Sequence, residues 1–120
     1  MAQHLELGRK GEDAAAEYLS KNGFSIREKN WKTKYGEIDI IAETPEFLVI
    51  VEVKTRSSAA FGNPEDAVDL RKQRLLVNMA DFYIRKFDIM KETRFDVLSV
   101  IMNAGGTSIT HYPFAFSPFD

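Results

Sequence analysis

Two apolar runs within residues 35–56 carry ionisable side chains at positions that otherwise suit a buried β-hairpin. A polar connection around Pro45 separates the runs and is typical of a turn. Asp39 interrupts the first run, and Glu52 and Lys54 interrupt the second. A charge in a buried strand is costly unless it is paired or binds a metal ion. This hairpin therefore constrains both the fold and the function of the chain.

The spacing of the hairpin predicts how its charges face one another. We expect strands at residues 37–42 and 47–54. Strict alternation would place Ile38 and Ile40 on one face of the first strand. The opposite face would then carry Glu37, Asp39 and Ile41. If the turn is centred between Pro45 and Glu46, Asp39 lies directly across from Glu52, with Lys54 one pleat away. Two facing carboxylates repel each other unless a cation lies between them.

The pattern D-x12-E-x-K, formed by Asp39, Glu52 and Lys54, suits metal-dependent chemistry. Two carboxylates and the Val53 backbone carbonyl offer the oxygen ligands that Mg²⁺ prefers, and Mn²⁺ is the other candidate. Lys54 could orient the attacking water and stabilise negative charge in a phosphodiester displacement. The alternative is a cross-strand ion pair on a solvated hairpin face. The flanking aliphatic residues argue against a solvated face.

A helix is expected at residues 4–21, and its apolar face lists as Leu5, Gly8, Gly11, Ala15, Ala16 and Leu19. Glu12 falls in the middle of that face. The two glycines would let the helix approach a sheet closely and bring this carboxylate to the hairpin, as a further metal ligand held directly or through water. The alternative is that Glu12 slides to the helix boundary and reaches water.

Composition narrows the class of protein. A length of 120 residues with 44% hydrophobic residues suits one domain, residues 1–120. The absence of cysteine excludes disulfides and thiolate metal ligands. No apolar run approaches the roughly 20 residues of a membrane span, so we expect a cytoplasmic protein. The net charge of -2 means that nucleic-acid binding would require a local basic patch.

The remaining segments complete the order αβββαββ. We expect a strand at residues 24–31, a helix at 63–86, strands at 94–102 and 107–112, and an irregular, phenylalanine-rich tail at 113–120. The basic side chains that could contact phosphates, or could simply protect a solvated strand edge, are Arg27, Lys29, Lys32, Lys34, Arg71 and Arg74. Lys72 lies in the apolar stripe of the second helix, where its aliphatic stem could also cover the core. His4 and His111 are expected to be solvated.

Five segments together resemble a known family. In order they are GRKGEDAAAEYL, GEIDIIA, VEVKTR, FGNPEDAV and RFDVLSV, within residues 8–100. They resemble the YraN-like bacterial family, uncharacterised protein family 0102, which is similar in pattern to archaeal Holliday-junction resolvases. The resemblance implies a restriction-endonuclease-like α/β fold, with an αβββαβ core and a mixed sheet flanked by helices, here followed by an extra C-terminal strand. It also implies a nuclease-type site with four key residues, which are Glu12, Asp39, Glu52 and Lys54. The supporting residues that it implies are Glu37, Thr55, Arg56 and Lys72.

The sequence thus leads to two main functional hypotheses and to a third, a structural interaction protein that uses its phenylalanine-rich tail. The first is a metal-dependent endonuclease-like protein that hydrolyses phosphodiester bonds in DNA, including branched or damaged DNA. The second is a nucleic-acid-binding or adaptor module on the same fold with little or no catalysis. A homodimer would suit a two-fold symmetric branched substrate, and the phenylalanine-rich tail is a candidate contact.

Overall fold

The structure is a computed structural model that describes residues 2–58 and 68–118. The described residues form two helices and five strands, in the predicted order. Their bounds are α1 (Ala2–Lys21), β1 (Ser25–Thr33), β2 (Gly36–Glu43), β3 (Phe47–Arg56), α2 (Leu70–Phe87), β4 (Glu92–Asn103) and β5 (Gly106–Phe116). Neither of these helices combines the length and apolar character required to span a membrane.

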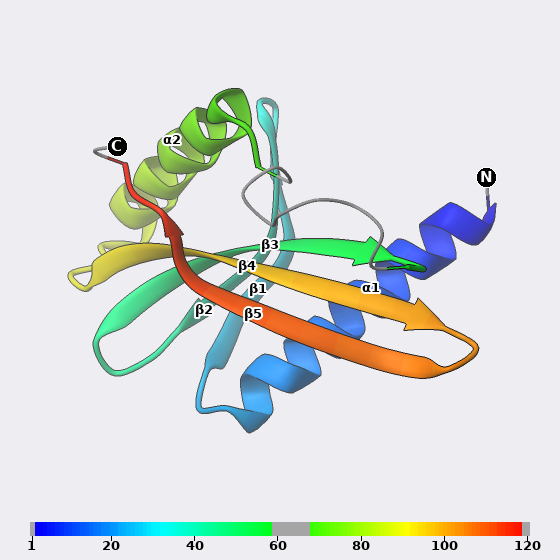
Figure 1. The fold of residues 1–120 in the computed structure, drawn as a ribbon. Coiled ribbons are helices and arrows are strands. Elements are labelled where there is room, and N and C mark those ends of the chain that lie inside the picture. Colours follow the sequence, from blue (N-terminus) through cyan, green and yellow to red (C-terminus); the bar gives the residue numbers. More distant parts are fainter. Residues whose placement is uncertain (1, 59–67, 119–120) are drawn as a thin grey trace.

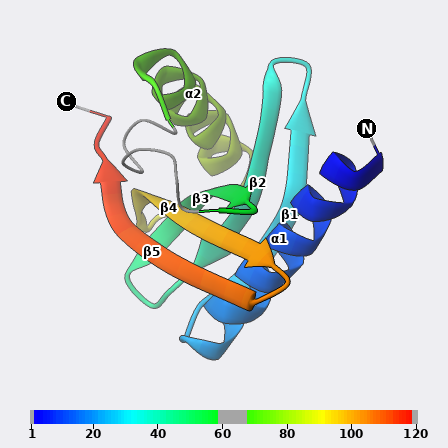
Figure 2. The ribbon, with the colours of Figure 1, turned by 45° about the vertical axis from the view of Figure 1, so that its right-hand side comes forward.

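The five strands make one mixed sheet in the order β1-β2-β3-β4-β5. β3 and β4 are parallel, and the other neighbours are antiparallel. A parallel pair requires a crossover connection, and α2 provides it between β3 and β4. Figures 1 and 2 show α1 and α2 on opposite faces of the sheet. The predicted mixed α/β fold, consistent with a restriction-endonuclease-like core, is therefore confirmed.

Each helix covers one hydrophobic core. The core beneath α1 lists as Ala15, Leu19, Ile40, Ala42, Val49, Val51, Leu98 and Val100. The core beneath α2 lists as Ile38, Ile41, Leu48, Ile50, Val68, Leu76, Met79, Ala80, Tyr83, Phe95, Val97. Since both faces of the central strands are covered, β3 runs from Phe47 to Val51 as five consecutive apolar residues.

The β2–β3 turn has the predicted register, because Ile40 pairs with Val51. The Thr44 hydroxyl accepts a hydrogen bond from the Phe47 N–H at 3.1 Å, and the Thr44 N–H donates to the Phe47 carbonyl at 2.9 Å. The paired register ends one residue before the predicted Asp39–Glu52 pair.

The predicted alternation along β2 is wrong at Asp39. Ile38 packs in the core beneath α2, whereas Ile40 packs in the core beneath α1, so the two do not share a face. Across from Asp39 in β1 lies Asn30, whose φ of 53° is left-handed. The side-chain alternation along the β1–β2 hairpin therefore breaks at this point, and Asp39 does not follow the regular pleat.

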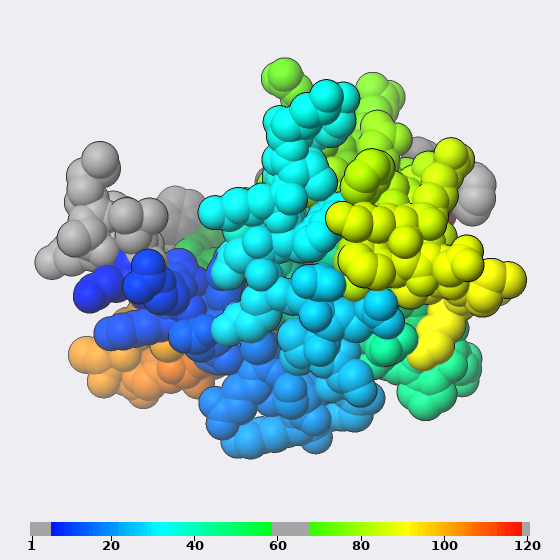
Figure 3. Space-filling view, turned by 180° about the vertical axis from the view of Figure 1, so that it is seen from behind, coloured from blue at the N-terminus to red at the C-terminus, as the bar shows by residue number. Residues whose placement is uncertain are grey.

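β2 and β3 separate just beyond Ile40. Among the described residues, pairing between these strands ends at Ile40 and Val51, while the start of β2 stays paired with β1 as far as Gly36. The β1–β2 hairpin rises away from the sheet beside α2 in Figures 1 and 2, and Figure 3 shows it (cyan) from behind. The two strands thus form a fork, which is open to side chains from both helices.

Two predicted boundaries differ from the structure. α2 begins at Leu70, because Asp69 is extended and its side chain accepts a hydrogen bond from the Lys72 N–H; the expected start at residue 63 lies outside the described residues. β5 continues to Phe116, so residues 113–116 are not irregular. A register shift lets this edge strand accommodate Pro113, with Phe114 at a φ of 52°. Phe119 lies outside the described residues.

Candidate functional site

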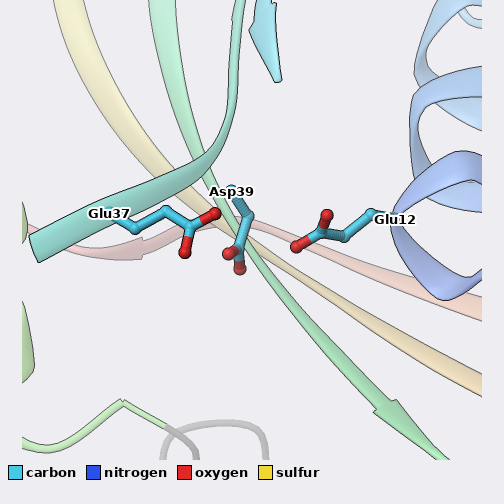
Figure 4. Close-up of side chains that lie close together, drawn as sticks. All are labelled: Glu12, Glu37 and Asp39. Atoms are coloured by element: carbon cyan, nitrogen blue, oxygen red, sulfur yellow. The ribbon is translucent and has the colours of Figure 1, made fainter. Parts of the chain in front are cut away.

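Three carboxylates from two elements converge at the fork. One oxygen from each of Glu12 on α1 and Glu37 and Asp39 on β2 lies within 4.8 Å of the others. Figure 4 shows the Glu37 and Glu12 side chains extending toward Asp39 from opposite sides. All three are half-buried. We call these residues, together with Glu52, the acidic cluster.

Close packing of α1 on β3 places Glu12. A Cβ atom at Gly11 would overlap the Thr55 side chain, so only glycine fits at this position without a shift of its surroundings. The approach predicted from the glycines is therefore confirmed for Gly11. At Gly8, by contrast, a Cβ atom would meet nothing within 4 Å. Thr55 was predicted as a supporting residue. Its side chain packs against α1 at Gly11, next to Glu12.

Asp39 replaces a missing backbone partner at the fork. Its Oδ2 accepts a hydrogen bond from the Val53 N–H at 2.8 Å. This N–H comes just after β3 has lost its pairing with β2, so the carboxylate satisfies a donor that the ladder no longer reaches. The bond also fixes the Asp39 side chain in the gap between the strands.

Glu52 is the most buried member of the acidic cluster, with 3% of its surface exposed. Its Oε2 lies 3.7 Å from the Lys54 ammonium and 3.5 Å from that of Lys72, which α2 supplies. Its Oε1 is buried and has no hydrogen-bond partner among the described residues. Buried polar oxygens nearly always have a hydrogen-bond partner, so Oε1 is an exception. It is available to a ligand.

The electrostatics of the cluster favour protons on two of its carboxyls, those of Glu52 and Glu12. Burial, followed by the charge of Asp39, raises the pKa of Glu52 to about 7, although Lys72 and Lys54 oppose the shift. Burial and Asp39 also raise the pKa of Glu12, against a hydrogen bond from the Asn30 side chain. A hydrogen bond between Asp39 and Glu12, or between Asp39 and Glu52, requires a proton on one of the two carboxyls. The site therefore holds more negative charge than its two lysines compensate.

Other predicted residues lie elsewhere. Arg27 donates to the Tyr83 hydroxyl at 2.9 Å and pairs with Glu43 at 3.3 Å, at the end of β2 remote from Asp39. Its charge is thus used within the fold and not at the site. Lys34 is exposed at the hairpin tip, with its ammonium 5.2 Å from the centre of the Tyr35 ring. Arg56 ends β3, two residues beyond Lys54.

A second polar cluster was missed from the sequence. Asp96 is 1% exposed and accepts two hydrogen bonds from Arg94, at 3.1 and 3.0 Å. Its Oδ2 also lies 2.7 Å from His111 Nε2, and His111 Nδ1 lies 3.2 Å from the Tyr18 hydroxyl. The expectation that His111 is solvated is therefore wrong. The Arg94 guanidinium lies 4.8 Å from the centre of the Phe114 ring, so this cluster ties α1, β4 and β5 together. The alternation in the printed sequence gave no signal for it.

The acidic cluster has the donor set of a hard-cation site. It offers carboxylate oxygens from three elements, one of them buried without a partner, and no nitrogen or sulfur ligand. Such oxygens suit Mg²⁺ or Mn²⁺. A divalent cation would relieve the mutual repulsion that raises the pKa of Glu52, so the residues present fit this kind of ion.

Comparisons with known proteins agree with the predicted resemblance. The family model described as uncharacterised protein family UPF0102 matches residues 11–100. A UPF0102 protein from Bacteroides thetaiotaomicron is 48% identical over 118 residues, which cover 98% of each chain. One from Flavobacterium psychrophilum is 46% identical over 99% of this chain and 100% of its own, and one from Persephonella marina is 45% identical over 80% of this chain and 84% of its own. The chain therefore belongs to the uncharacterised protein family UPF0102, the YraN-like family.

Proposed function

We propose that this protein is a metal-dependent endonuclease that hydrolyses phosphodiester bonds in DNA. The observation that carries the proposal is the convergence of Glu12, Glu37 and Asp39 beside Glu52, whose buried Oε1 has no partner among the described residues. A fold gains no stability from crowding like charges. Binding a divalent cation is the function that best accounts for keeping them together.

The acidic cluster would hold Mg²⁺ or Mn²⁺ through Asp39, Glu52, Glu12 and Glu37, with the Val53 carbonyl as the further predicted ligand. A bound divalent ion supplies Lewis acidity to the phosphate and to the attacking water. The Val53 N–H keeps Asp39 oriented. The ion pair to Glu52 keeps the Lys54 ammonium beside the cluster, where it can orient water and stabilise negative charge on the phosphate.

Lys72 would give the site a second cation from the opposite helix. Its ammonium approaches the same Glu52 oxygen as Lys54. Since both lysine side chains are about one-third exposed, at 36% and 37%, they can also reach a phosphate in the opening. Two cations beside four carboxylates would position an anionic backbone next to the bound metal.

DNA, branched or damaged, is the proposed substrate, and the cytoplasm is the proposed location. A homodimer would present two such sites to a branched molecule. The substrate and the dimer follow from the similarity of the family to resolvases and from the chemistry of the acidic cluster.

The test is cleavage of branched, flapped and linear DNA with Mg²⁺ or Mn²⁺. Asp39→Asn keeps an oxygen for the Val53 N–H, so it should fold while losing at least about a hundredfold in rate. Glu12→Gln should also lose activity, and its matched control is Glu17→Gln, on an exposed position of the same helix. Cleavage that persists at the wild-type rate in Asp39→Asn and Lys54→Ala would refute the site assignment.

The adaptor hypothesis makes a different prediction for the same samples. DNA binding that survives EDTA and Glu52→Ala, with no cleavage of any substrate, would favour a module without catalysis.

A further inference from the structure

A groove runs between the β1–β2 hairpin and α2, on the face of the sheet that carries the α2 core. Residues 31–35 form one wall, and α2 residues from Leu75 to Lys86 form the other. The space between them is about 800 Å³. Figures 1 and 2 show the hairpin and α2 side by side, and in Figure 3 the hairpin (cyan) stands against α2 (yellow-green). We call this the hairpin–helix groove.

Both walls of the groove lead along the chain toward the acidic cluster. On the helix wall, Leu75 lies one turn after Lys72, which pairs with Glu52. On the hairpin wall, Tyr35 comes two residues before Glu37 and about 13 Å along an extended chain from Asp39. A chain molecule that lies in the groove would therefore reach the carboxylates at its end.

Aromatic rings line the groove, and two of them are largely exposed. Tyr35, in the turn between β1 and β2, is 70% exposed, and Phe82, on α2, is 56% exposed. Trp31 is half-buried, with its ring centre 6.1 Å from that of Phe82. Exposed rings grouped in a concave surface mark an interaction site. Flat rings are also the platforms on which unpaired bases stack.

The charge of the groove is opposite to that of the whole chain. Four exposed cationic residues line it, and they list as Lys32, Lys34, Arg85 and Lys86. The acidic residue among the lining is Asp81, which already pairs with Arg85 at 3.2 Å. The chain as a whole carries a net charge of -2, so these cations are a local concentration. An apolar protein segment would not require them, whereas a polyanion would.

We propose that the hairpin–helix groove binds an unpaired DNA strand. Its bases stack on Tyr35 and Phe82, and its phosphates contact the surrounding lysines and arginine. A base-paired duplex keeps its base faces covered, so the rings select single-stranded DNA. This inference rests on the proposed nuclease function and narrows its substrate to DNA with a single-stranded branch or flap beside the scissile bond.

Fluorescence anisotropy of a short labelled oligo(dT), measured in EDTA, tests the inference without requiring cleavage. Tyr35→Ala and Phe82→Ala should each weaken binding about fivefold or more, whereas Tyr35→Phe, which keeps the ring, should bind like the wild type. Lys34→Ala should reduce the steepness of the logarithmic salt dependence by about 0.7. The matched control is Phe114→Ala, which removes a ring of similar exposure, 58%, from β5.

Wild-type oligo(dT) affinity in both Tyr35→Ala and Phe82→Ala would overturn the inference. Sedimentation of the same samples then identifies the other occupant: a wild-type dimer that becomes monomeric in these variants would assign the groove to a second copy of the chain. Binding of oligo(rU) without binding of oligo(dT) would also overturn it. Circular dichroism confirms that each variant is folded.

Cleavage assays distinguish failure of the groove from failure of the nuclease proposal. If oligo(dT) binding depends on Tyr35 but no substrate is cut, the groove inference stands and the nuclease proposal fails. If the wild type cuts DNA but Tyr35→Ala binds and cuts like it, the groove inference fails alone. We expect Tyr35→Ala to slow cleavage of flapped DNA more than cleavage of linear duplex, whereas Asp39→Asn should abolish both.

Discussion

Replacing Glu52 with glutamine should stabilise the metal-free protein at neutral and alkaline pH. Glutamine has the shape of a protonated glutamic acid but cannot ionise, so it removes a buried negative charge beside Asp39. The ion pairs with Lys54 and Lys72 are lost too. Burial and Asp39 nonetheless outweigh them, because the pKa of Glu52 is raised and not lowered.

The magnitude follows from the pKa. The folded protein holds the Glu52 proton more tightly than the unfolded chain, whose value is near 4.5, so stability is fully present below about pH 4.5 and falls as pH rises through about 7. Relative to Glu52→Gln, the wild type should therefore lose roughly 2 to 3 kcal/mol of unfolding free energy between pH 5 and pH 8. The raised pKa of Glu12 acts in the same direction in both proteins.

Urea unfolding in EDTA at the two pH values measures this difference. Glu46→Gln, at an exposed position in the β2–β3 turn, is the matched control and should follow the wild type. A gap between Glu52→Gln and the wild type that stays constant from pH 5 to pH 8 would refute the reasoning, since it would mean that Glu52 titrates as it does in the unfolded chain.

Adding metal should reverse the ranking of the two proteins. A cation that binds only the folded state at a hundred times its Kd adds about 2.7 kcal/mol to the free energy of unfolding. We expect Mg²⁺ or Mn²⁺ to give the wild type such a gain at pH 8 and to give Glu52→Gln much less. Equal gains would show that Glu52 is not a ligand.

Two further predictions concern packing. Gly11→Ala should lower the free energy of unfolding by about 1 to 3 kcal/mol, because the new methyl group would overlap Thr55. Gly8→Ala, which has open space around it, should raise helix stability by up to about 1 kcal/mol. Urea unfolding measures both variants, and equal changes in the two would contradict the prediction. Asp96→Ala should cost about 3 to 5 kcal/mol, because it leaves the Arg94 guanidinium, with 13% of its side chain exposed, without its carboxylate. Thermal unfolding that shifts by less than a degree would count against a structural role for this pair.

The hairpin and the first helix could be predicted because their signals are local. The turn around Pro45 sets the register that pairs Ile40 with Val51, and this register brings the Asp39 segment beside the Glu52 segment, where the two strands separate. Glycine at position 11 is likewise a local signal of close approach, and the structure places Thr55 against it.

Other features depend on long-range contacts that no period records. The break in alternation at Asp39 lies opposite Asn30, a left-handed residue of another strand. A prediction from strict alternation therefore assigned Ile38 and Ile40 to the same face, which is wrong. Arg27 looked available for phosphates until its partners, 16 and 56 residues away, were known. The pairing of His111 with Asp96 depends on the β4–β5 register, whose shift near Phe95 was not visible in the sequence.

The order of synthesis also determines when the acidic cluster gains its second lysine. The residues of α1, β2 and β3 leave the ribosome before Lys72 and β4, yet β3 becomes a central strand only when β4 pairs along its other edge. A nascent chain that ends before α2 would carry all four carboxylates but neither the second lysine nor the cover over the α2 core. The candidate site thus receives its second cation only after α2 has been synthesised, and a chain truncated before α2 would lack the ion pair between Lys72 and Glu52.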